Sequence, residues 1–258
     1  MTWKINKSII LLLITSVISY FIIKGIKSSI AINKTLAQGL EVIKKYTNMG
    51  EIDIGDYKKI IIKKIFPFYT TAYKINNVGF LAILSINIGI FQVFSFHLSP
   101  YQKDFPIIII DYMQYFGKRQ ALFETYNATV DKNNNILKNF INEFEQIKNN
   151  YSDIKEWKLS PQLADGRVVV NMRKEGNDKQ DDRFTSLFSD VIEIYMKNIM
   201  NMPKLEGDEK NKKAELIKEF AEQLVINGGI ASKIFKSDMK EEDVIKLFVE
   251  LFFGFNYQ

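Results

Sequence analysis

The spacing of apolar residues changes near residue 131, and this change is the strongest constraint on the fold. From Val78 to Tyr126 apolar residues form short runs separated by turn residues, which is typical of β-strands. From Ile136 onward they recur at helical spacing. A run of strands followed mostly by helices predicts a single α+β domain, in which helices cover an antiparallel sheet.

Turn and breaker residues divide this pattern into elements. The expected strands are two in Val78–Leu98, with a turn at Asn87 and Gly89, then Pro106–Asp111, Gln120–Tyr126 and Gly166–Met172. The expected helices are Leu40–Tyr46, Ile136–Ile147, Phe184–Met202, Ala214–Ile226 and a last one capped by Ser237 or Asp238. Tyr57–Phe66 fits either a helix or a strand and is expected to end at Pro67. The charged segment Glu206–Lys213 is expected to be a solvated loop.

The rarity of cysteine and histidine restricts the chemistry. Among 258 residues there is no cysteine and one histidine, His97. These counts exclude a disulfide framework, thiolate-bound zinc, a cysteine nucleophile and a metalloprotease site built on two histidines. If the chain is an enzyme, carboxylates, hydroxyls, amides or tyrosines carry the reaction, or a ligand supplies the reactive group.

The N-terminal segment is apolar and basic. Ser8–Ile23 holds 16 residues without a charge, somewhat fewer than the roughly 20 of a membrane-spanning helix. The first 35 residues contain five lysines and no acid, so 35 − 5 = 30 basic residues balance 30 acidic ones in the rest of the chain. This neutral body argues against a nucleic-acid-binding protein, because phosphate binding needs a basic face.

Two interpretations of the N-terminal segment stay open. One is a membrane anchor followed by a polar stalk. The other is a bipartite leader that directs the protein to a plastid, because the hydrophobic stretch is followed by acid-poor sequence up to Leu40. In both cases we expect residues 1–40 to be a leader or anchor and residues 41–258 to form one domain.

Asp111 and His97 are the first candidates for chemistry. Asp111 follows four isoleucines at the expected end of a strand. Burial there would raise the pKa of its carboxyl, and a carboxylic acid that is protonated near neutral pH can donate a proton. Alternatively, Asp111 caps the following turn. His97, which shares a strand face with Ser95, is either a catalytic group or an ordinary satisfied or solvent-facing histidine.

Several segments together resemble the ferredoxin-dependent bilin reductases, relatives of red chlorophyll catabolite reductase. FQVFSFHLSP at 91–100 and DFPIIIID at 104–111 resemble two successive strands of that family, and LFET at 122–125 resembles the next, with Glu124 in place of the usual aspartate. LSP at 159–161, IEIYMKNIM at 192–200 and VIKLFVELFFGF at 244–255 are similar to later elements of the family. The resemblance covers most of residues 75–258 and rests on the order and spacing of these segments.

The resemblance implies a three-layer α/β/α sandwich that holds an open-chain tetrapyrrole between its sheet and its C-terminal helices. It implies an oxidoreductase acting on CH–CH bonds of a biliverdin-type bilin, with no bound metal or other cofactor. Electrons would arrive singly from reduced ferredoxin and protons would come from the protein. Asp111 falls on the family's proton-donating aspartate, Ser95 falls where the family has histidine or asparagine, and Gly228, beside Asn227, falls near a second family acid.

These departures place proton delivery on Asp111, with His97 as a further contributor. The resemblance leads us to expect ligand contacts from Arg167, Arg173, Lys118, Arg119 and Asn227, because bilin propionates need cationic partners and guanidinium pairs bidentately with carboxylates. Docking of acidic ferredoxin would use a local patch, Lys58–Lys64 or Lys118–Arg119. The alternatives are a non-catalytic tetrapyrrole-binding protein of the same fold and a membrane-anchored interaction domain.

Overall fold

One antiparallel sheet forms the middle of the molecule. The computed structural model describes residues 7–131, 134–157 and 166–257. Within these residues the sheet has nine strands: eight follow the order β1-β3-β4-β5-β6-β7-β9-β8, and the ninth, β2, pairs with β3 on the same side as β1. The strands are β1 (Met49–Ile52), β2 (Lys59–Ile62), β3 (Phe66–Ile75), β4 (Gly79–Ile88), β5 (Phe91–Ser99), β6 (Ile107–Tyr115), β7 (Lys118–Tyr126), β8 (Lys155–Glu156) and β9 (Val168–Asn177).

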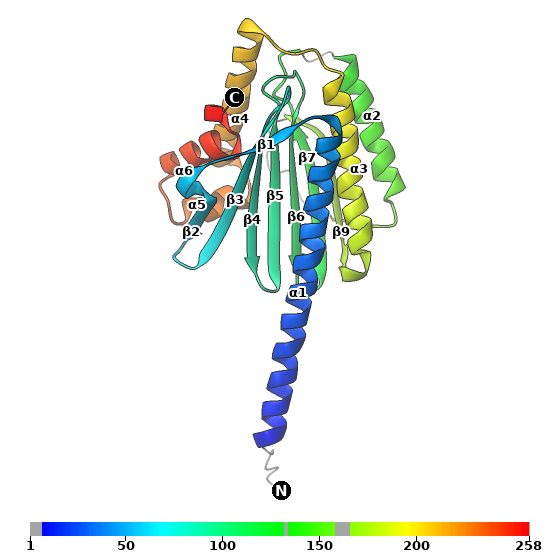
Figure 1. Ribbon diagram of the computed structural model, residues 1–258, viewed down its shortest axis with the longest axis vertical. Coiled ribbons are helices and arrows are strands. Elements are labelled where there is room, and N and C mark those ends of the chain that lie inside the picture. Colours follow the sequence, from blue (N-terminus) through cyan, green and yellow to red (C-terminus); the bar gives the residue numbers. More distant parts are fainter. Residues whose placement is uncertain (1–6, 132–133, 158–165, 258) are drawn as a thin grey trace.

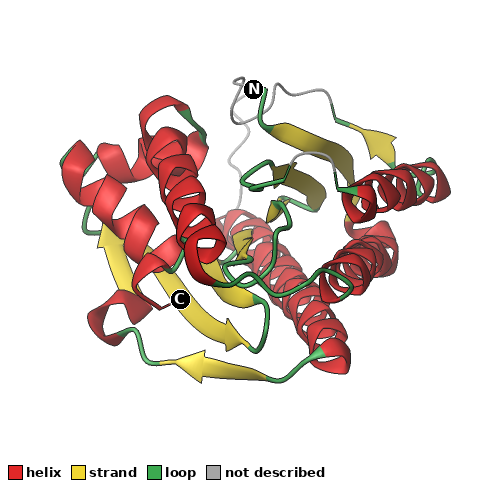
Figure 2. Ribbon diagram, turned by 90° about the horizontal axis from the view of Figure 1, so that it is seen from above, coloured by secondary structure: helices red, strands yellow, loops and turns green. Residues whose placement is uncertain are grey.

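Helices cover both faces of this sheet, which confirms the α/β/α sandwich (Figures 1 and 2). One face carries α1 (Lys7–Tyr46), α2 (Asn135–Asn150) and α3 (Asp181–Met200). The other carries α4 (Gly207–Asn227), α5 (Ile230–Lys236), α6 (Glu241–Leu247) and a π-helical turn, Phe248–Phe252. Single 3₁₀ turns occupy Gly55–Lys58, Asp178–Gln180 and Phe255–Tyr257.

Alternation along the strands sorts side chains between two cores. In β5, Phe94 and Phe96 face α1–α3, whereas Ser95 and His97 face α4–α6. The Phe94 ring meets Phe188 of α3 edge-on at 5.3 Å between centroids. Because both faces are covered, the isoleucines at 107–110 of β6 are all buried. Complete burial of one such side chain contributes roughly 2 kcal/mol.

Helix α1 runs without a break through the boundary expected at residue 40. The helix predicted at Leu40–Tyr46 is only the end of a 40-residue helix. Ile32 and Thr35 are buried, and the Thr35 Oγ1 lies 2.8 Å from Oγ1 of Thr185 in α3. A Cβ at Gly39 would come within 2.1 Å of the Phe188 ring, so only glycine allows this approach of the two helices. The part of α1 that follows residue 28 therefore packs as part of the folded body.

Near the first hairpin the structure decides one open alternative and corrects one expectation. Of the two alternatives for Tyr57–Phe66 the structure shows the strand: β2 follows the 3₁₀ turn Gly55–Lys58, and Lys63 and Lys64, both at positive φ, lie between β2 and β3. Pro67 does not stop a strand but lies inside β3, opposite Ile61 of β2. It is tolerated there because pairing of β3 with β4 begins only at Tyr69, so no ladder hydrogen bond to β4 is lost.

The prediction of a solvated loop at Glu206–Lys213 is wrong. Helix α4 begins at Gly207, and Lys213 is fully buried. Its Nζ donates to the carbonyl oxygens of Phe105 and Ala128, each at 2.6 Å. The density of charged residues indicated an exposed segment, but a lysine can be buried where carbonyl groups accept its hydrogen bonds. Burial lowers the pKa of Lys213 to about 7.

Lys213 should make stability depend on pH. Its pKa is depressed in the folded state, so between pH 7 and the ordinary value of 10.5 the unfolded chain binds more protons and stability rises with pH. Between pH 7 and 9 the unfolding free energy of the protein should rise by about 2 kcal/mol more than that of Lys213→Met. Denaturant unfolding at both pH values measures it, with the exposed neighbour Lys212→Met as the control. An equal pH dependence in all three proteins would contradict the assignment.

Candidate functional site

The register of β5 and β6 places Ser95 directly opposite Asp111. The Ser95 hydroxyl donates to Oδ1 of Asp111, and its Oγ lies 2.7 Å from Nε2 of His97. One hydroxyl therefore joins all three residues that the sequence predicts to be catalytic. The sequence places Asp111 at the end of a strand, but in the structure it lies inside β6, which continues to Tyr115. Its half-buried side chain is on the sheet face that carries α4–α6.

His97 is held as a neutral ring. It is only 6% exposed and packs against Phe253 and Phe252, with ring centroids 5.3 and 6.2 Å away. Burial lowers the pKa of His97 to about 4. Since the Ser95 hydroxyl proton points to Asp111, the Ser95 oxygen accepts from His97, which places the imidazole proton on Nε2. Nδ1 is then a bare acceptor, and it has no hydrogen-bond partner among the described residues.

A second polar cluster lies beside the first, on β7 and β9. Glu124 is completely buried and accepts from Arg173 at Oε1 and from the Tyr126 hydroxyl at Oε2. Burial, followed by the negative charges of Glu124 and Asp111, raises the pKa of Tyr126, so its hydroxyl stays protonated. The Tyr126 ring packs on Phe220 of α4 at 4.7 Å between centroids. Sequence reasoning missed Tyr126, although alternation from Glu124 places both residues on one face.

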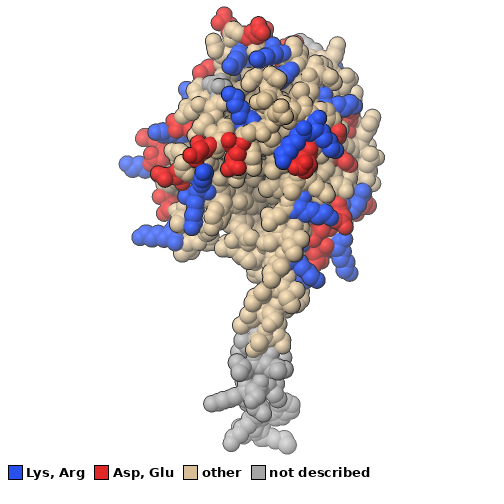
Figure 3. Space-filling view, viewed as in Figure 1, with Lys and Arg blue, Asp and Glu red and all other residues tan. Residues whose placement is uncertain are grey.

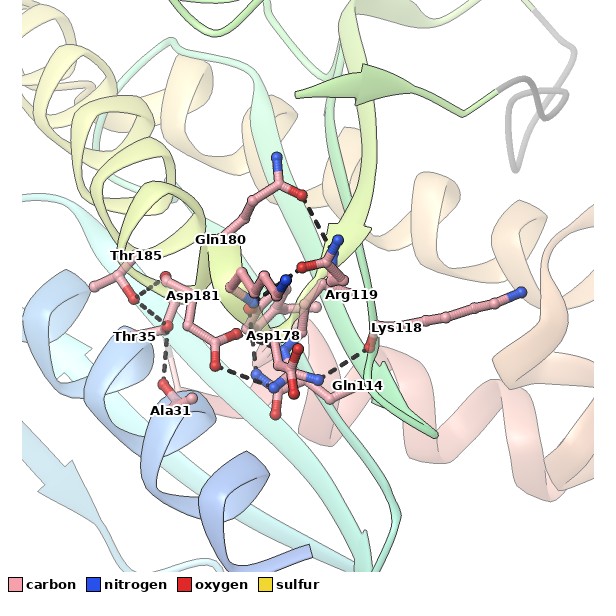
Figure 4. A network of polar contacts seen from close by, with 12 residues as sticks. Ala31, Thr35, Gln114, Lys118, Arg119, Asp178, Gln180, Asp181 and Thr185 are labelled. Atoms are coloured by element: carbon pink, nitrogen blue, oxygen red, sulfur yellow. Dashed lines mark hydrogen bonds and ion pairs between the residues drawn. The ribbon is translucent and has the colours of Figure 1, made fainter. Parts of the chain in front are cut away.

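Two of the four cations expected to bind a ligand are engaged in buried ion pairs. Arg173 pairs with Glu124 inside the protein. Arg119 is 1% exposed, and its Nε lies 2.5 Å from Oδ1 of Asp181 in α3 (Figure 4). Neighbouring strand residues point to opposite faces, so Arg119 is on the side away from Asp111 and belongs neither to its site nor to an exposed docking patch.

Lys118 and Arg167 are nearer to solvent. Lys118 is exposed at the start of β7 and lines an open groove of about 410 Å³ together with Gln120 and Glu175. Arg167 is half-buried just before β9, and its Nη2 lies 3.1 Å from Oε1 of Glu219 in α4. Of the expected cations, Arg167 is the one paired with the helices that face Asp111.

The end of α4 carries the last expected contacts. Asn227 is exposed, and its side chain donates to Gln223 at 2.7 Å. At Gly228 a Cβ would come within 2.2 Å of the Leu224 carbonyl oxygen. An acidic side chain at 228 would therefore require the helix end to move, which accounts for glycine at this position. The LSP segment at 159–161 is outside the described residues.

Comparison with solved structures identifies a protein of the same architecture. The chain is similar to selenomethionine-labelled phytochromobilin synthase from tomato, whose structure was determined in complex with biliverdin. The match covers 87% of this chain and 84% of that one, with a TM-score of 0.69 and 13% sequence identity. No family model and no curated protein matches the sequence. At this identity the similarity concerns the fold: the chain has the fold of phytochromobilin synthase, as the resemblance to bilin reductases predicts.

Proposed function

We propose that the chain reduces a biliverdin-type linear tetrapyrrole, with reduced ferredoxin as the electron donor and Asp111 as the proton donor. The observation that carries the proposal is the chain of hydrogen bonds from His97 through Ser95 to Asp111, on the sheet face covered by the C-terminal helices. The shared fold with a biliverdin-bound protein supports it.

The proposed reaction needs two electrons and two protons for each double bond. Two molecules of reduced ferredoxin supply one electron each and become oxidised, while two protons reach the pigment and convert C=C into CH–CH. Asp111 delivers a proton through its carboxyl group. Because its side chain is half-buried rather than fully enclosed, water can reprotonate it between the two electron transfers. One carboxyl can then serve twice, without a second acid at Gly228.

Ser95 and His97 act as positioning residues in this proposal. The neutral imidazole donates from Nε2 to Ser95, and Ser95 donates to Oδ1 of Asp111. The two hydrogen bonds hold the Asp111 carboxyl in one position on the sheet, where it would meet the pigment. Neutral His97 does not compete with Asp111 as an acid at physiological pH, because with a pKa near 4 it lacks the second ring proton that an imidazolium would give up.

Arg167 is the favoured partner for a propionate of the pigment. Its ion pair with Glu219 is partly open to water, where such a pair contributes little to stability. A propionate can therefore replace Glu219 at small cost. Arg173 has the opposite role, because removing it from Glu124 would leave a buried carboxylate unpaired.

A plastid location remains a prediction, and the fold limits how much of a leader could be removed. Cleavage near residue 40 would take away Ile32 and Thr35, which are buried in the folded body. A removable leader would therefore have to end before Lys24, where the polar contacts of α1 with the rest of the body begin.

Replacing Asp111 tests catalysis. Asp111→Asn preserves the shape and the hydrogen bond from Ser95 but has no acidic proton. We expect biliverdin still to bind, seen as a shifted absorption band, and its conversion by photoreduced ferredoxin to slow by about 100-fold or more. Glu145→Gln, an exposed acid on α2, is the control. An unchanged rate in Asp111→Asn would overturn the assigned role, and pigment binding without conversion by the unaltered protein would point to a non-catalytic binding protein.

The protonation of His97 is open to direct measurement. As the only histidine in the chain, it gives a single set of imidazole nitrogen signals in ¹⁵N NMR. We expect the pattern of a neutral ring protonated at Nε2 from pH 8 down to about 5, because burial holds the pKa near 4. Ser95→Ala should change the Nε2 shift and leave the ring neutral. A titration midpoint near 6.5 would show that His97 is solvated rather than packed against Phe253.

A further inference from the structure

Three hairpin turns lie at the end of the molecule from which the N-terminal half of α1 projects (Figure 1). In an antiparallel sheet, alternate connections fall at the same end, and here these are the turns β2–β3, β4–β5 and β6–β7. We call these turns, residues 63–66, 88–91 and 115–118, the hairpin end. The start of α4 lies at the opposite end of the body.

The hairpin end exposes large apolar side chains next to lysines. Ile65 is 66% exposed and Phe116 is 69% exposed. Ile88 and Phe91 are exposed in the β4–β5 turn. Lys63, Lys64 and Lys118 are exposed in the same turns. Two acids nearby are engaged: Asp178 pairs with Lys24, and Asp238 accepts the backbone N–H of Lys63.

The projecting part of α1 continues this apolar surface. Val17, Ile18, Ile22 and Ile23 are each more than half exposed. Figure 3 shows this part of the helix as a column without charged side chains. Among the described residues, α1 is the one helix long and apolar enough to cross a membrane. Isolated exposed apolar residues are common, but a contiguous patch of this kind marks an interaction site.

The charge-free run of the sequence ends at the level where α1 reaches the hairpin end. Lys24 is the first charge after Ser8–Ile23. The Phe21 ring lies 6.3 Å from the Phe116 ring, edge to face. At the next turn of the helix, Gln92 donates to the Gly25 carbonyl oxygen at 3.0 Å. Sequence and structure thus place the same boundary between apolar and polar surroundings independently of each other.

Polar contacts fix α1 to the body at this boundary. Lys24 forms an ion pair with Asp178, and Asn87 donates to the Ser29 hydroxyl at 2.9 Å. Figure 4 shows the neighbouring network, in which Thr35 meets Thr185 and Arg119 meets Asp181. The helix is therefore fixed to the domain from Lys24 onward, so its tilt there determines how the domain is held.

We propose that the protein docks upright on a lipid bilayer, with Ser8–Ile23 embedded and the hairpin end seated among the headgroups. Sixteen helical residues span roughly 24 Å, a few ångströms less than the roughly 30 Å hydrocarbon core. Apolar hairpin turns that enter the interface, with lysines reaching the phosphates, accommodate this mismatch. Anionic lipid complements the lysines, whereas a second copy would oppose lysine to lysine across a symmetric contact.

Single cysteines can test this docking cleanly, because the chain contains none. Ile65→Cys and Phe116→Cys report two separate turns of the hairpin end. Val17→Cys reports the helix, and Glu209→Cys, at the start of α4, is the matched control at the opposite end. Each full-length variant carries an NBD fluorophore and is reconstituted as a single copy in nanodiscs of phosphatidylcholine and phosphatidylglycerol in equal parts. One copy per disc removes self-association as a source of shielding.

We expect labels at 17, 65 and 116 to be quenched by nitroxide lipids and shielded from aqueous iodide, and the label at 209 to behave in the opposite way. Nitroxides just below the headgroups should quench 65 and 116 more than deeper nitroxides do. If 65 and 116 are open to iodide like 209, the docking proposal is wrong, even when 17 is in lipid, and Lys63 and Lys64 face water or a soluble partner. Thermal unfolding of each variant checks that the fold is retained.

Discussion

The antiparallel pairing of β5 with β6 is the constraint on which the rest of the candidate site depends. It sets Ser95 opposite Asp111 and leaves Phe94 and Phe96 on the other face, against α3. A slip of one residue would turn the carboxylate of Asp111 into the aromatic core. An unpartnered carboxylate buried there would cost several kcal/mol. The polar pair of Ser95 and Asp111 thus favours this register, whereas the isoleucines of β6 are buried on either face.

The two faces of the sheet differ in the side chains that they bury. The face under α1–α3 is packed with aromatic rings from Phe94 to Tyr195 and is the larger of the two cores. The face under α4–α6 combines apolar packing with a belt of polar groups, in which His97, Asp111 and Glu124 occupy neighbouring strands. Buried polar groups are tolerated only when they are hydrogen-bonded, and in this belt Ser95 and Arg173 supply those bonds. A site built on adjacent strands gains its geometry from the ladder itself.

Much of this could be predicted from the sequence because local patterns determined it. Short apolar runs bounded by turn residues located β4 to β7, and helical spacing located α2, α3 and most of α4. The shared face of Ser95 and His97 followed from alternation alone, whereas their contact with Asp111 needed the strand register. Tertiary partners decided the failures: Lys213 reads as a surface residue until the carbonyls of Phe105 and Ala128 are placed beside it. Arg119 reads as a ligand contact until Asp181 approaches from another segment.

The N-terminal helix, too, could be predicted only in part from the sequence. Its composition divides it at Lys24, but only the fold shows that its second half packs on α3 and that its first half projects from the hairpin end. We propose that the pigment meets the sheet face that carries Asp111. A crystal structure of the full chain with biliverdin tests it most directly. We predict that the pigment lies between the sheet and α4–α6, with a carbon of its conjugated system in contact with the Asp111 carboxyl. Pigment bound on the α1–α3 face, or in the groove beside Lys118 away from Asp111, would contradict the account.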